Sequence, residues 1–411
     1  MSRAIGACAQ LALAALVGSV AGASVLGGLF VYLSWNRIGA RLLGFGLPQY
    51  LLRESSTSSS AVAGPRTGRL AVRLGLIGLL LTVSTASAAI LADRERILPL
   101  VLAAGIGATG QVLLTAGSMT LKGYGRPSSA FLVEFALVPT ATASLILAAE
   151  IRTTATIMLV HAVCSLTFGV TLIVLIWFDR IGRAAELEVR TDTALSVGPS
   201  RSEVLGFGTV ALADVILTFS PILLLAAFVD TESVAAFAVA QRIVGVAVLI
   251  LLALDGHFAP RFASAYVAGD RHLLDQYRRR AQVLSLAFYL PLCLLFFAAP
   301  NWLTDAFGGD LPRVGTLLAI LALGQVVNAA TGLCASLLLM TAREKELSVV
   351  LAAAVCLYIP ISLLTSHSGG TAGMAWTVAG TLAIISLASW HLARQVTQGS
   401  DEVRWSESEP A

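Results

Sequence analysis

The chain is dominated by apolar stretches of about 20 residues, each long enough to cross the hydrocarbon core of a membrane as a helix. We predict twelve spans, at residues 4–22, 26–50, 69–91, 97–119, 127–149, 154–178, 203–228, 233–258, 280–300, 314–339, 346–366 and 370–395. The composition, 57% hydrophobic and 12% charged, lies far from that of a soluble domain. Because a helix satisfies its backbone groups within its own segment, the sequence predicts an all-α integral membrane protein.

Basic residues are distributed unevenly between the two sides of this layout. With both termini cytoplasmic, the inner loops and tails carry twenty of the 27 Lys and Arg residues, the outer loops carry four, and three lie inside spans. Short loops on the cytoplasmic side of membrane proteins are enriched in Lys and Arg. We therefore predict a multi-pass protein of the cytoplasmic membrane with both termini in the cytoplasm.

Two longer inner segments interrupt the series of spans. Residues 55–69 have the composition of a flexible loop, and residues 179–202 form a mixed-charge linker. This linker predicts an N-terminal six-helix lobe over residues 1–178, a C-terminal six-helix lobe over 203–396, and a cytoplasmic tail over 397–411.

The two lobes also share short sequence motifs. The tripeptide that starts at Gly110 in the fourth span, GQV, recurs at Gly324 in the tenth span, 214 residues later. Pro48 near the end of the second span has a counterpart in Pro260 near the end of the eighth, 212 residues later. Similar offsets predict a repeat of six spans with parallel orientation, related by an axis along the membrane normal.

Three arginines lie inside the predicted spans, where a charged side chain costs roughly 2.5 to 3.5 kcal/mol on insertion scales. Arg37 and Arg41 are four residues apart and thus share a helix face, and Arg242 lies in the eighth span. One interpretation is a binding site for a phosphate or pyrophosphate, which suits the donor fork of arginine. The alternative is neutralisation by three carboxylates, also within spans: Glu134, Asp214 and Asp255.

The same carboxylates have a second interpretation. Glu134 and Asp214 are candidates for ion or proton coupling, because acidic groups inside transporters often have this role. His161, isolated on an apolar span, is expected to be a hydrogen-bonded core residue. The basic amphipathic segment over residues 265–281 is expected to lie on the inner leaflet, in contact with anionic membrane lipids.

Motifs for chemistry are missing from the sequence. It contains no Walker A loop, GxSxG or HExxH motif, and no outer loop long enough for a catalytic domain. The five cysteines are scattered singly without neighbouring histidines, which disfavours a metal site or a disulfide framework. We therefore predict no catalytic residues, metal or cofactor, no nucleic-acid partner, and no enzyme activity.

Four stretches resemble the Wzx-type polysaccharide flippases, a family of the MOP superfamily that also contains the MATE exporters. The eighth span and its exit, with AQR at Ala240, Pro260 and the sequence SAY at Ser264, resemble the eighth helix of that family. The others are GFGLPQYLLRE at 44–54, LKGYGRPSSAFLVEFALVP at 121–139 and ILALGQVVNAATG at 320–332. The chain departs from the family in its short start and in lacking extra terminal spans.

The resemblance implies a MATE-like MOP fold with two six-helix lobes. It further implies a flippase that moves polyprenyl-pyrophosphate-linked oligosaccharide across the cytoplasmic membrane, by alternating access, for polysaccharide biosynthesis. Arg37, Arg41 and Arg242 would then bind the anionic pyrophosphate head group, and glycan-biosynthesis proteins could be further partners. Two alternatives stay open: a MATE-like cation-coupled exporter of small molecules, and a non-transporting scaffold of a glycan-biosynthesis complex.

Overall fold

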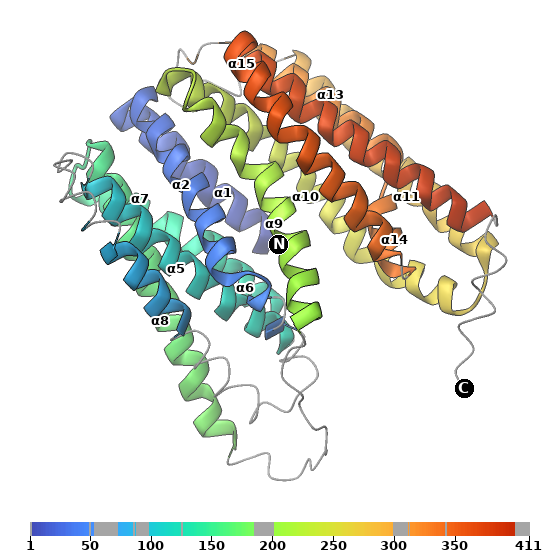
Figure 1. Ribbon diagram of the computed structural model, residues 1–411, viewed down its shortest axis with the longest axis horizontal. Helices are drawn as coiled ribbons and strands as arrows, with labels where there is room; N and C mark the ends of the chain where they lie inside the picture. The colour runs from blue at the N-terminus through green and yellow to red at the C-terminus, as the bar shows by residue number, and fades with distance from the viewer. Residues whose placement is uncertain are drawn as a thin grey trace. The chain divides into compact units, whose positions relative to one another are not determined.

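The computed structural model describes residues 2–48, 73–84, 98–124, 126–184, 201–298, 313–341 and 343–398, with 51, 52, 87 and 311. Every regular element within these residues is a helix (Figure 1). By length and composition, six of the described helices could cross a membrane: Leu98–Lys122, Pro127–Ala148, Thr154–Trp177, Arg271–Phe296, Val314–Thr331 and Lys345–Thr397. The predicted all-α fold class is confirmed.

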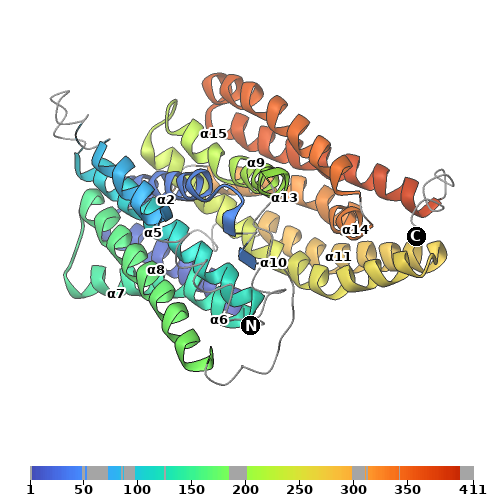
Figure 2. The same ribbon diagram turned by 60° about the horizontal axis from the view of Figure 1, so that its bottom comes forward.

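The first of two compact units comprises mainly Met1–Ala226. Its helices are α1 (Ser2–Ala21), α2 (Ala23–Gly44), Arg73–Ser84, α5 (Leu98–Gly123), α6 (Pro127–Leu132), the π-helical turn η2 (Val133–Leu137), α7 (Val138–Ala148), α8 (Thr154–Ala184) and α9 (Arg201–Leu225). α5 packs along both α8 and α2, and this arrangement can be followed in Figure 2. α9 packs against α2, so this unit extends beyond the linker at which we expected it to end. The division into lobes of six spans stays a prediction.

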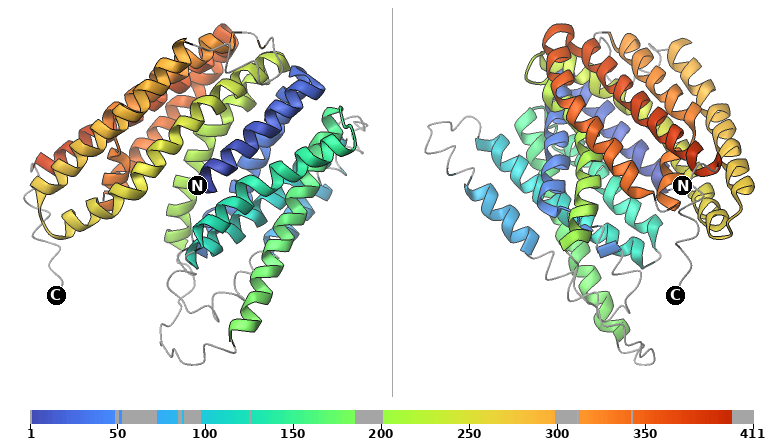
Figure 3. Two further views of the ribbon diagram at one scale, coloured as in Figure 1. Left: turned by 180° about the vertical axis from the view of Figure 1, so that it is seen from behind. Right: turned by 45° about the vertical axis from the view of Figure 1, so that its right-hand side comes forward.

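The second unit contains most of the chain from Ala227 onward. Its helices are α10 (Thr231–Val267), α11 (Arg271–Ala298), α13 (Val314–Thr331), α14 (Cys334–Met340) and α15 (Glu344–Gln398). α10, α11 and α13 pack against one another, and α15 packs along α13. Figure 3 shows this unit from two further sides. The predicted spans that fall on described residues are largely helical.

Two glycines interrupt helices of the second unit. Gly370, with φ 56°, divides α15 into segments that match the eleventh and twelfth predicted spans. Gly332, with φ 74° and ψ −153°, separates α13 from α14, whereas we expected the tenth span to be continuous. Only glycine adopts this last conformation readily, because a Cβ would clash with the backbone.

The hairpin formed by α10 and α11 in the second unit differs from the expectation. α10 continues through Pro260 to Val267, and α11 already begins at Arg271, so the predicted loop over residues 259–279 is largely helical. The proline removes one backbone donor but lies inside the helix. The Arg261 guanidinium donates to the carbonyl of His257 at 3.0 Å. α10 thus continues where the proline predicted its end.

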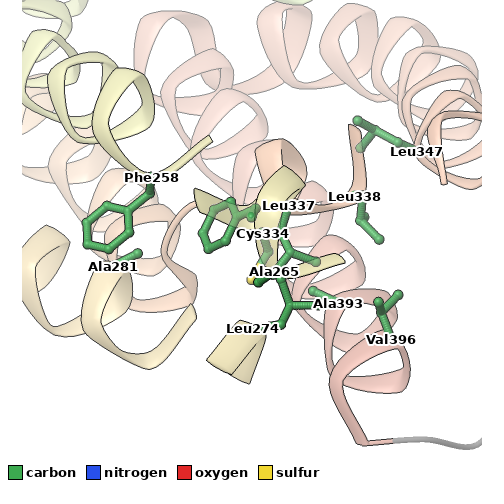
Figure 4. Close-up of a cluster of buried hydrophobic side chains, with 11 residues drawn as sticks. Phe258, Ala265, Leu274, Ala281, Cys334, Leu337, Leu338, Leu347, Ala393 and Val396 are labelled. Carbon is green, nitrogen blue, oxygen red and sulfur yellow. The ribbon is translucent and has the colours of Figure 1, made fainter. Parts of the chain in front are cut away.

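This hairpin is held by a hydrophobic cluster (Figure 4). The cluster comprises Phe258, Phe262, Ala265, Leu274, Ala281, Cys334, Leu337, Leu338, Leu347, Ala393 and Val396. The apolar face of residues 265–281 thus packs against α14 and α15. The contact of this segment with anionic lipids of the inner leaflet stays a prediction.

The repeated GQV motif has corresponding packing roles in the two units. A Cβ on Gly110 of α5 would overlap the backbone nitrogen of Leu166 on α8. A Cβ on Gly324 of α13 would lie 2.7 Å from the Cα of Ala379 on α15. Each glycine thus allows the fourth span of its predicted lobe to cross the sixth at close range. This correspondence supports the internal repeat.

Candidate anion-binding site in the N-terminal unit

The candidate site begins with the three faces of α2. One face is a buried stripe with a spacing of four residues, Tyr32, Asn36, Ala40 and Gly44, and it packs toward Val112 of α5. A second face carries Trp35 and Leu42, which are exposed apolar side chains. Arg37 and Arg41 follow the buried stripe by one residue and are half-buried. The spacing of four therefore places both arginines on one face, as predicted.

Arg37 contacts an aromatic ring of the neighbouring π-helical turn. Its guanidinium carbon lies 5.2 Å from the centroid of the Phe135 ring, at cation–π distance. α1 approaches the same turn at Gly6, where a Cβ would lie 2.7 Å from the Cβ of Phe135. The missing side chain of Gly6 thus allows α1 to pack over η2 and to fix the position of Phe135.

The π-helical turn has an identifiable local cause. Pro139, the second residue of α7 after η2, cannot donate a hydrogen bond to the carbonyl of Phe135, four residues earlier. A wider turn relieves the clash of the proline ring with that carbonyl, and the Thr140 hydroxyl donates to the next carbonyl, that of Ala136, at 2.7 Å. Single π-helical turns often occur at functional sites.

Glu134 lies in this turn and pairs with a lysine. Its carboxylate accepts a hydrogen bond from the Ser118 hydroxyl at 2.7 Å and from the Lys122 ammonium at 3.2 Å. The carboxylate side chain is 5% exposed and the lysine side chain 16% exposed. Lys122 also lies in the last turn of α5, where the helix dipole favours a cation. The ion pair of Glu134 is thus with Lys122, and the neutralisation of the arginines by the three carboxylates stays a prediction.

Arg41 retains an unsatisfied donor. Its Nη1 atom is buried and has no hydrogen-bond partner among the described residues. Asp214 on α9 is exposed and lies within electrostatic range of Arg41, and Arg37 lies within electrostatic range of both Glu134 and Arg41. The structure thus brings Arg37, Arg41, Glu134 and Asp214 into one unit, together with Lys122.

Arg242 and Asp255 both lie on α10, in the other compact unit. They are 13 residues apart on one helix, which corresponds to about 20 Å along its axis, so they cannot neutralise each other. Oδ1 of Asp255 is buried without a hydrogen-bond partner in the described part of the chain. The participation of Arg242 in the same site as Arg37 and Arg41 stays a prediction.

A separate polar cluster lies deeper in the N-terminal unit. His161 is buried, and its Nδ1 lies 3.3 Å from the Tyr32 hydroxyl and 3.4 Å from the Ser165 hydroxyl. The interpretation of His161 as a hydrogen-bonded core residue is confirmed. Within the described ranges, no group of three or more His, Cys, Asp or Glu residues could hold a metal ion.

Sequence reasoning missed Lys122 as a member of this cluster, because we assigned it to an inner loop. A signal was nonetheless present. The turn between α5 and the helix that starts at Pro127 is short, so the last turn of α5, which carries Lys122, lies beside the antiparallel segment that carries Glu134.

Comparisons with known proteins bear on the fold. The MatE family model matches residues 209–364, and no curated protein matches the sequence. A MATE multidrug-resistance transporter of the MOP superfamily, in an inward-facing conformation, has a TM-score of 0.71 at 15% identity, with 97% of this chain and 96% of that one covered. The chain thus shares the fold of this transporter.

Two further solved structures share this MOP fold. The Vibrio cholerae MATE transporter VcmN, in a bent form, has a TM-score of 0.60 at 17% identity and covers 97% of this chain and 95% of its own. A MOP transporter from Pyrococcus furiosus has a TM-score of 0.64 at 13% identity and covers 97% of this chain and 94% of its own. The Pyrococcus furiosus transporter is described as having a binding pocket of reverse polarity, which suggests a different function for that protein.

Proposed function

We propose that the protein is a membrane transporter that works by alternating access and moves polyprenyl-pyrophosphate-linked oligosaccharide across the cytoplasmic membrane. The cationic site would take the pyrophosphate head group, and the lipid tail would stay in the bilayer. The two lobes would then expose this site to each side in turn. The resemblance to Wzx-type flippases supports the cargo, and the MOP fold supports the transport mechanism.

One observation carries the choice of an anionic cargo. Arg41 has a buried donor without a hydrogen-bond partner among the described residues, while Glu134 is engaged by Lys122. A buried donor left unpaired costs free energy, and a charge-assisted bond to a phosphate oxygen would recover it. The described cluster contains three cations, Arg37, Arg41 and Lys122, against two carboxylates, and therefore has the polarity that an anion requires.

A MATE-like exporter of cations is the alternative, and the exposed carboxylate of Asp214 favours it. Such an exporter would need carboxylates without basic neighbours. Glu134, however, is paired with Lys122, and Asp214 lies within electrostatic range of Arg41. The fold alone does not fix the charge of the cargo, since the Pyrococcus furiosus transporter has the same fold and is described as having a binding pocket of reverse polarity.

The experiment compares Arg37→Gln, Arg41→Gln and Arg242→Gln with the unmodified protein. Each change should remove a charge-assisted contact of about 1.5 to 3 kcal/mol and lower the affinity for a prenyl diphosphate by about ten- to hundredfold. Glycan export should fall while the melting temperature stays unchanged. Arg126→Gln is the matched control, because this arginine is exposed at the start of α6.

Two results would contradict the proposal. Variants that export glycan normally would show that the arginines do not contact the cargo. Variants that lose export only because they no longer fold would show that the arginines hold the structure. Removal of one partner of a buried ion pair lowers the free energy of unfolding by about 3 to 5 kcal/mol. A folded protein that exports no glycan and binds no diphosphate would favour the scaffold.

A further inference from the structure

Lys122 and Arg37 contact opposite ends of one aromatic pair. The Lys122 ammonium lies 4.6 Å from the centroid of the Phe131 ring. Phe131 is stacked on Phe135, with ring centroids 5.9 Å apart and an interplanar angle of 25°, and the Arg37 guanidinium lies over Phe135. Two cations from α2 and α5 are thus arranged around one pair of rings from α6 and η2.

Glu134 lies in the sequence between the two rings, Phe131 and Phe135. It accepts hydrogen bonds from Ser118 and Lys122 and lies within electrostatic range of Arg37. The carboxylate therefore has two partners besides Lys122, a hydroxyl and an arginine charge. It would not be stranded if the lysine moved away.

We propose that Lys122 is a third cation of the anion-binding site and that Glu134 is the resident counter-ion which holds it until a diphosphate arrives. This inference rests on the proposed function and deepens it. Lysine carries a compact charge on a flexible four-carbon stem, so its ammonium can turn from one acceptor to another without movement of the helix. Ser118 and Arg37 would continue to stabilise the carboxylate after the exchange.

Because Lys122 would exchange the Glu134 carboxylate for the diphosphate, the ion pair competes with the cargo for the lysine. In the empty site, the carboxylate takes up part of the positive potential that would attract an anion. Removal of its charge should strengthen diphosphate binding, whereas removal of the lysine charge should weaken it. A purely structural ion pair predicts no such opposition, because loss of either partner would act in the same direction, through stability.

The test uses the purified full-length protein and farnesyl diphosphate as the probe, with farnesol as the uncharged control. We expect Glu134→Gln to raise the affinity for farnesyl diphosphate about three- to tenfold, and Lys122→Gln to lower it about tenfold. Lys122→Arg should retain most of the binding, since it keeps the charge. Farnesol binding should be the same in all variants.

A double variant keeps the test decisive if one single variant folds poorly. Glu134→Gln combined with Lys122→Gln removes both charges and leaves neither stranded. The gain from Glu134→Gln should be much smaller in this background, because the lysine that it releases is missing; this non-additivity is the signature of the exchange.

The outcomes separate the inference from the proposed function. If folded Glu134→Gln binds farnesyl diphosphate no better than the unmodified protein, or if its gain persists in the double variant, the exchange is overturned. If the unmodified protein does not bind farnesyl diphosphate, or if Arg41→Gln binds it equally well, the proposed function itself fails.

Discussion

Asp230 offers a test of what one side chain contributes to a helix end. Its carboxylate accepts a hydrogen bond from the backbone N–H of Ser233 at 2.8 Å and thereby caps α10. We expect Asp230→Ala to destabilise the protein by about 1 kcal/mol. Asp230→Asn, which can still cap the helix, should cost less. Melting temperatures at neutral pH measure both changes.

The same residue predicts a pH dependence. The hydrogen bond from the Ser233 backbone holds the pKa of the Asp230 carboxyl below its usual range. Because the pKa is depressed in the folded state, its contribution is present above the unfolded value of about 3.9 and is lost as the pH falls through the folded pKa. The difference between the unmodified protein and Asp230→Asn should therefore shrink in acid. A difference that grows in acid would contradict this assignment.

How far single residues could be predicted depended on whether their partners were local. The shared face of Arg37 and Arg41 follows from a spacing of four on one helix. The pairing of Glu134 with Lys122 depends on a π-helical turn, which shifts the direction of the carboxylate in a way that helical periodicity does not indicate. The unsatisfied donor of Arg41 depends on packing among several helices and has no sequence signal.

The close packing of helices at Gly110 and Gly324 can be tested by substitution. Gly110→Ala and Gly324→Ala would each place a methyl group against the backbone of the facing helix. We expect each to destabilise the protein by about 1 to 3 kcal/mol. Gly245→Ala on α10 and Gly380→Ala on α15 are the controls, since no atom lies within 4 Å of either new Cβ.

The controls should change stability in the opposite direction. Alanine favours an exposed helix interior over glycine by up to about 1 kcal/mol. Thermal unfolding in detergent measures all four variants. Equal effects at the crossing glycines and at the controls would show that the close approaches do not exist, and the packing argument for the repeat would be lost.

The ends of elements were less predictable than their existence. Apolar length was sufficient to find the helices, but Pro260 was a misleading end signal, since α10 continues through it to Val267. Gly332 interrupts a stretch that is continuous in hydropathy. Such interruptions depend on backbone geometry, which the apolar pattern does not encode.

At the scale of the whole molecule, the orientation in the membrane stays a prediction. We expect a thiol reagent that cannot cross membranes to label cysteines placed at Thr153 or Thr231 from outside intact cells, and not cysteines placed at Ser59 or Ser196. The native cysteines must first be replaced, since Cys8 and Cys356 are exposed. Labelling of Ser59 or Ser196 positions from outside would reverse the orientation and with it the argument from basic loops.

The fold of the whole chain was the most predictable property, because twelve apolar lengths and a resemblance to one superfamily pointed to the same architecture. The arrangement of spans into lobes was less predictable. Because α9 packs on α2, α9 belongs to the N-terminal compact unit, although we expected it in the C-terminal lobe. Ser59 and Ser196, in the inner loop and the linker, lie outside the described residues.

The π-helical turn over Val133–Leu137 has a consequence for how this site could arise or disappear. A π-helical turn holds one residue more than the α-helical turn that it replaces. Deletion of a single codon there would convert it to an α-helical turn, which covers about the same rotation with one residue fewer, so the flanking segments would keep their faces. Side chains inside the turn, Glu134 and Phe135 among them, would change direction relative to Phe131. One codon thus decides whether these side chains meet Lys122 and Arg37.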